Sequence, residues 1–170
     1  MLEEFARQKK INDVIKTENT LGLRFSLILA VAVIIAAMAV AFFIPPATER
    51  VLETRTSLAG VVNIIAIAMI IVILAVRRTI YFSPRLFPGV ESIDLKTLLR
   101  KWRAIDLVLN SLAGLIGFLG LLLALSGFPF IRTFHFFVSS WLVMMILMPI
   151  PWKVRDKIRN FEKSGGSIDV

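Results

Sequence analysis

Hydrophobic residues along this chain gather into four long runs that contain no Asp, Glu, Lys or Arg. These runs have 24, 21, 25 and 20 residues and cover Phe25–Thr48, Thr56–Val76, Leu107–Ile131 and Thr133–Trp152. A helix needs roughly 20 apolar residues to cross a hydrocarbon core. The pattern therefore predicts four transmembrane helices, at about residues 25–45, 57–77, 105–126 and 132–150.

The connections between these runs are short and contain residues that end helices or form turns. Pro45-Pro46 ends the first run, and Ser126-Gly127-Phe128-Pro129 supplies a turn between the third and fourth runs. Short connections make consecutive helices antiparallel neighbours. We therefore expect an all-α, polytopic membrane protein: a four-transmembrane-helix bundle of two antiparallel hairpins, in one membrane domain over residues 1–170.

A second hydrophobic pattern lies in the long connection, residues 78–104, before the third run. Apolar residues follow there with helical spacing, at Leu95, Leu98, Leu99 and Trp102. Ser92 is the expected N-cap of this helix. Its other faces are basic, with Lys96, Arg100, Lys101 and Arg103. A basic amphipathic helix is typical of a membrane interface, so we expect these four residues to contact anionic lipid headgroups.

The two ends of the chain are more polar than the rest. Residues 1–21 predict a charged helix with a thin apolar stripe. It is either a solvated or interfacial lead-in helix or a docking arm for a partner. Residues 151–170 are expected to be a tail, flexible at Ser164-Gly165-Gly166-Ser167 because of its composition.

Composition and charge agree with a membrane protein and add an orientation. The chain is 57% hydrophobic, with a mean hydropathy of +0.80 and a net charge of +8. Lys and Arg are in excess at the N-terminal segment, the long connection and the tail, whereas the other two connections are nearly balanced. By the positive-inside rule both termini are cytoplasmic, in a prokaryotic-type cell membrane. Because the charge sets topology here, we expect no nucleic-acid partner.

Small and polar residues recur on one face of three of the predicted spans. On the first span they are Ser26, Ala30, Ala37 and Ala41. The face of the third span contains Asp106, Asn110, Ala113, Gly117, Gly120 and Ala124. The face of the second contains Thr56, Ala59, Gly60, Asn63 and Ala66. Such faces allow close helix packing, with Asn63 and Asn110 as polar contacts between helices. The alternative interpretation is a polar lining for a pore or ligand cleft.

Two ionisable residues adjoin the predicted spans. Asp106 lies at the cytoplasmic end of the third span, where we expect it to pair with Arg103, Arg77 or Arg78. His135, the single histidine of the sequence, lies near the outer end of the fourth span. We expect it to form a hydrogen bond there. Axial ligation of a cofactor by two histidines would require a second subunit.

The sequence contains no cysteine and shows no nucleophile–base pair, metal-ligand cluster or phosphate-binding loop. We therefore expect no catalytic residue, metal or cofactor. The favoured hypothesis is a non-catalytic membrane subunit, a scaffold or accessory chain of a larger complex. One alternative is a homo-oligomeric channel or small-solute carrier, and another is an interfacial lipid-binding protein or enzyme. Expected partners are membrane lipids and other subunits, or further copies of this chain.

Overall fold

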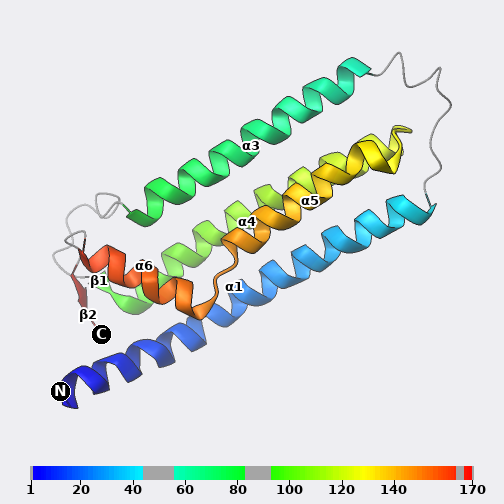
Figure 1. Cartoon of the computed structure of the whole chain (residues 1–170). Coiled ribbons are helices and arrows are strands. Elements are labelled where there is room, and N and C mark those ends of the chain that lie inside the picture. Colours follow the sequence, from blue (N-terminus) through cyan, green and yellow to red (C-terminus); the bar gives the residue numbers. More distant parts are fainter. Residues whose placement is uncertain (1, 44–55, 83–92, 164–166, 170) are drawn as a thin grey trace. The chain divides into compact units, whose positions relative to one another are not determined.

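The computed structural model describes residues 2–43, 56–82, 93–163 and 167–169 (Figure 1). This part of the chain contains five α-helices and two very short strands. The helices are α1 (Leu2–Phe43), α3 (Thr56–Phe82), α4 (Leu95–Leu125), α5 (Phe130–Leu147) and α6 (Pro151–Lys163). The strands are β1 (Ile93–Asp94) and β2 (Ile168–Asp169).

Four of these helices are long and apolar enough to cross a membrane. Their candidate spans are Glu4–Phe43, Leu58–Thr79, Leu95–Leu125 and Phe130–Leu147. The predicted all-α class, with four helices of spanning length, is therefore confirmed. The expected helix end at Pro45-Pro46 and the expected N-cap at Ser92 lie outside the described residues.

The chain divides into two compact units. The head unit comprises Met1–Phe25, Ala75–Val108 and Met148–Val170. The bundle unit comprises Ser26–Leu74 and Leu109–Leu147. Helices α1, α3 and α4 each contribute residues to both units.

Close approach of helices to α4 organises the bundle unit. A Cβ atom added to Gly114 would lie 3.2 Å from the Leu29 side chain of α1, and one on Gly117 would lie 3.2 Å from Oγ of Ser140 on α5. At Gly120 the same atom would meet Cβ of Phe136 at 2.7 Å, a distance that side chains cannot tolerate. Gly117 and Gly120 of the predicted small-residue face therefore allow close packing of α5, and Gly114, outside that face, allows close packing of α1.

The turn between α4 and α5 follows from a single glycine. Gly127 has a positive φ of 92° and follows the last turn of α4. Its N–H donates to the carbonyl of Ala124 at 2.9 Å, and the N–H of Phe128 donates to that of Leu123 at 3.2 Å. These two bonds form a Schellman motif, which satisfies carbonyl groups at the helix end.

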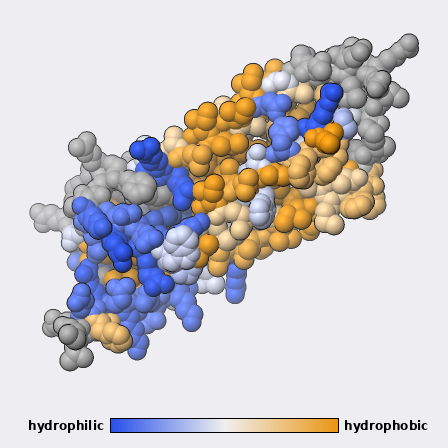
Figure 2. Space-filling model, viewed as in Figure 1, coloured by the Kyte–Doolittle hydropathy of each residue, from blue (hydrophilic) through white to orange (hydrophobic). Residues whose placement is uncertain are grey.

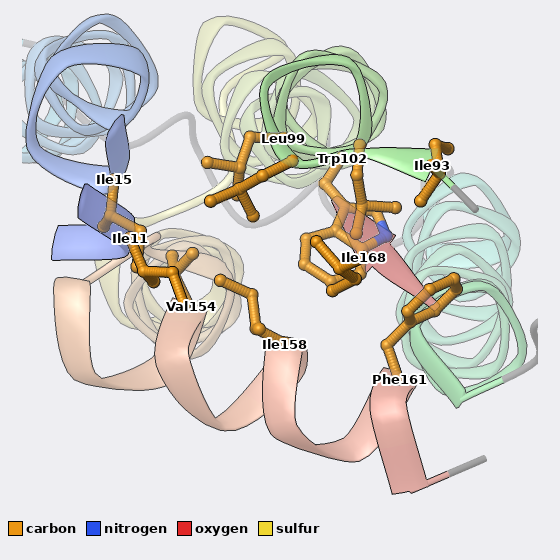
Figure 3. Packing of buried hydrophobic residues seen from close by; sticks show 11 residues of the cluster. Ile11, Ile15, Ile93, Leu99, Trp102, Val154, Ile158, Phe161 and Ile168 are labelled. Carbon is orange, nitrogen blue, oxygen red and sulfur yellow. The ribbon is translucent and has the colours of Figure 1, made fainter. Parts of the chain in front are cut away.

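An apolar core holds the head unit together (Figure 3). It combines side chains from α1, α4, α6 and both strands: Ile11, Ile15, Ile93, Leu95, Leu98, Leu99, Trp102, Val154, Ile158, Phe161 and Ile168. The Trp102 and Phe161 rings meet edge to face, with centroids 6.2 Å apart. The apolar face of residues 95–102, expected to lie in a membrane interface, is buried inside the protein instead; Leu98 is 0% exposed and Trp102 2%.

The segment expected to be a tail begins with helix α6, and residues 164–166 of the stretch expected to be flexible lie outside the described residues. Pro151 begins α6, a position that suits proline because its missing N–H has no partner there. Beyond α6, β2 pairs in parallel with β1, so that Ile168 lies opposite Ile93. Asp94 then caps α4, since its Oδ2 accepts bonds of 3.1 Å from the N–H and the hydroxyl of Thr97.

Candidate functional site

The first charged cluster of the head unit is a buried ion pair between α4 and α6. Nζ of Lys157 donates to Oδ2 of Asp106 at 3.4 Å, and the two side chains are 14% and 7% exposed. The pair draws together residues 51 positions apart in sequence. Asp106 thus has a partner from outside the expected set of Arg77, Arg78 and Arg103.

The charge on Lys157 is sensitive to its surroundings. Burial lowers the pKa of its ammonium group to about 8, a shift that Asp106 opposes and that Arg77 and Lys153 increase by repulsion. Partial burial and Arg77 also lower the pKa of Lys153. The end of α3 therefore contributes Arg77 to this cluster, whereas Arg78 is exposed. A lysine with such a pKa can exchange its proton near neutral pH.

The second cluster surrounds Glu18 of α1, whose side chain is 11% exposed. Three cations of α4 approach its carboxylate: Lys96 at 3.9 Å, Arg100 at 3.7 Å and Arg103 at 3.4 Å. Arg103 also donates to the Glu18 carbonyl at 3.2 Å. Three of the four residues expected to contact lipid headgroups therefore converge on one carboxylate, while Lys101 is exposed.

A small enclosed pocket joins the two clusters. Its volume is about 20 Å³, and its lining includes Glu18 and Arg103 from one cluster and Asp106 and Lys157 from the other. A space of this size is enough for one water molecule. Nδ2 of Asn19, which also lines the pocket, donates to the carbonyl of Pro149. The arrangement holds α1, α4 and the start of α6 together through polar contacts.

The polar residues of the bundle unit lie in contacts between helices. Nε2 of His135 on α5 is 2.8 Å from Oδ1 of Asn63 on α3, and the imidazole also packs on the Phe136 ring at 4.2 Å. The Ser140 hydroxyl of α5 donates to the carbonyl of Ala113 on α4 at 2.7 Å. Asn110, the other predicted polar contact, is 1% exposed. Asn63 and His135, proposed separately from the sequence, thus come together.

Two functional elements escaped the sequence analysis: Glu18 as a centre of charge, and the whole of α6. A signal for α6 is present in the sequence. Val154, Ile158 and Phe161 repeat with helical spacing after Pro151. Among the residues that the structure describes, no three His, Asp or Glu side chains form a group able to hold a metal ion.

No protein-family model, curated protein or solved structure matches the chain. Its function is therefore argued from the geometry of the two units.

Proposed function

We propose that this protein is a non-catalytic integral membrane subunit, a scaffold or accessory chain of a larger membrane complex. Its four long apolar helices cross the membrane as two antiparallel hairpins, and both termini lie in the cytoplasm together with the head unit. The excess of Lys and Arg at the head-unit ends of the helices supports this orientation. Anionic lipid headgroups are the expected neighbours of the exposed cations there.

The incomplete covering of α3 is the observation that carries this proposal. Only 11% of its apolar stretch is buried, compared with 44% for α4. Gly60 lies on an exposed part of α3, and no described atom lies within 4 Å of a Cβ placed on it. Lipid tails adapt to large side chains, whereas a glycine on a helix face favours close approach of another helix. We infer that a helix of another chain packs on α3 at Gly60.

The polar residues of the bundle unit favour assembly over transport. The contacts of Asn63 with His135 and of Ser140 with Ala113 each join two helices. Gly117 and Gly120 are occupied by α5, which packs against them closely. These contacts support helix packing as the role of the residues that the channel hypothesis places along a pore.

Isolation of the tagged protein from native membranes in a mild detergent tests the proposal. We expect it to co-purify with other chains in fixed proportion. Gly60→Leu should reduce the co-purified chains several-fold without altering the stability of the protein, because the space around Gly60 is open. Val61→Leu, at an exposed neighbouring position, is the matched control. A protein that travels alone or only with copies of itself would overturn the proposal.

A further inference from the structure

A groove runs along the head unit between α1 and α6. One part has a volume of about 420 Å³, and its lining includes Ile15, Leu23, Pro151 and Arg155. The other part has about 160 Å³ and is lined by Ile11 and Ile158 together with Arg155, which belongs to both. We call this continuous surface the α1–α6 groove. Figure 3 shows Ile11 and Ile15 of α1 facing Val154 and Ile158 of α6.

Leu23 and Pro151 supply apolar surface in the groove, above core residues that are buried, and cations line its edges. Three cations line it, Lys16, Arg155 and Arg159, and no described carboxylate lies within ion-pair distance of them. Glu162, which also lines it, is held by Arg7 at 2.9 Å. Asn12, Asn19 and Thr20 add amide and hydroxyl groups. The lining therefore complements a ligand with an apolar face and flanking negative charges.

We propose that the α1–α6 groove binds an acidic amphipathic helix of a partner subunit. A helix of this kind lays its apolar side chains, spaced i, i+3, i+4 and i+7, into a groove and exposes its polar side. Its Asp and Glu residues then face Lys16, Arg155 and Arg159. This inference rests on the proposed function, because it supplies the contact through which the head unit joins a larger complex.

The length of the groove favours a helix over a lipid headgroup. Its α1 wall extends from Gln8 to Leu23, which is about 22 Å at 1.5 Å per residue. Lys16 lies nine residues before Phe25, where the first charge-free run begins, and so about 13 Å from it. The headgroup layer of one leaflet is only about 5–8 Å thick. With the first span beginning at Phe25, as the charge-free run predicts, Lys16 lies beyond the headgroup layer, whereas a helix of about 15 residues matches the length of the groove from Gln8 to Leu23.

Photo-crosslinking in native membranes tests this proposal directly. A photoreactive residue replaces Asn12 or Thr20 in the groove, and Asp13, which is exposed but does not line the groove, is the control position. We expect crosslinks from the two groove positions, identified by mass spectrometry, to a segment rich in Asp and Glu with apolar residues at helical spacing. Crosslinks to phospholipid, or to a basic or unpatterned segment, would overturn the proposal.

Charge reversal separates this inference from the function on which it rests. Arg155→Glu with Arg159→Glu should lower the crosslink yield at least tenfold, whereas Lys10→Glu, on another face of α1, should leave it unchanged. Lys16→Gln and Arg155→Gln, which disturb folding less, should each give a smaller decrease. If partner chains co-purify and crosslink equally well with every variant, the proposed binding of an acidic helix in the α1–α6 groove is wrong, and the proposed subunit function is unaffected. If the wild-type protein has no partner chains, the proposed function itself fails.

Discussion

The head unit exposes few of its large apolar side chains, whereas the bundle unit exposes many. In the head unit Leu98 and Trp102 are 0% and 2% exposed, whereas in the bundle unit Ile28 and Ile64 are each 69% exposed. Figure 2 shows hydrophobic residues gathered over a broad part of the viewed surface. Burial of a large apolar side chain away from water stabilises a protein by about 1.5–3 kcal/mol, but a hydrocarbon surrounding removes that gain. The difference agrees with the proposal that the bundle unit is surrounded by lipid and the head unit by water.

The contacts that join the helices also differ between the head unit and the bundle unit. The head unit combines an apolar core with ion pairs of 3.4–3.9 Å around Glu18 and Asp106. The bundle unit relies on glycines and on single hydrogen bonds such as Ser140 to Ala113. An added methyl group should therefore disturb the bundle unit most, and a change of pH or salt the head unit. The following experiments test this contrast.

Gly120→Ala should have the largest effect. Its new Cβ would lie 2.7 Å from Cβ of Phe136, so α4 and α5 must separate or distort. Overpacking of this kind destabilises by about 1–3 kcal/mol. Gly60→Ala is the control, because the same atom meets no described neighbour within 4 Å and alanine favours a helix by about 1 kcal/mol. Thermal unfolding in detergent should show a midpoint below that of the wild-type protein for Gly120→Ala but not for Gly60→Ala. Equal unfolding midpoints for the two variants would contradict the close packing of α4 and α5 at Gly120.

The pH dependence of stability should come from Lys157. Its pKa is about 8 in the folded protein and has an ordinary value of 10.5, so between these values the unfolded chain binds more protons. The free energy of unfolding should therefore rise with pH in this window, by at most about 1.4 kcal/mol per pH unit, and the Lys157 contribution should be constant below it. Lys157→Met should remove that rise. Denaturant unfolding at pH 7 to 10 measures the difference, and parallel curves for both proteins would exclude Lys157 as the cause.

Glu18→Gln should have the smallest effect. The Glu18 side chain is 11% exposed and Arg103 27%, but its other two partners, Lys96 and Arg100, are 55% and 57% exposed, so solvent and salt reach the cations. Exposed ion pairs contribute about 0.2–1 kcal/mol each, and salt screens them. The loss of stability should therefore be small and should shrink further in 1 M salt, measured by the same denaturant unfolding. A large loss that persists in high salt would show that Glu18 acts through buried contacts instead.

The four long apolar helices could be predicted because charge is so costly in hydrocarbon that long charge-free runs stand out in the sequence. The amphipathic helix before the third span was also predictable from Leu95, Leu98, Leu99 and Trp102. The surroundings of this helix could not be predicted from the sequence. The same apolar stripe suits a membrane interface and a protein core, and only the positions of Val154, Ile158 and Phe161 on α6 decide between them.

The charged clusters were harder to predict for a different reason. Asp106 and Lys157 are far apart in sequence, and Glu18 meets cations of α4 across the head unit. Local spacing carries information about neighbours three or four residues apart, such as Arg103 and Asp106. Local spacing contains no information about pairs of residues that only the tertiary fold brings together. His135 and Asn63 illustrate the same limit, since each was recognisable as a polar residue but not as the partner of the other.

The core of the head unit also sets an order of events during synthesis. It includes Ile15 and Ile168, separated by about 150 residues. At roughly 5–20 residues per second, the ribosome needs roughly 8–30 s to add that length. All residues of the bundle unit are made before Ile168, so its helices can associate while the apolar stripe of α1 still lacks its final neighbours. The core of the head unit can therefore be completed only after the whole of the bundle unit has been synthesised.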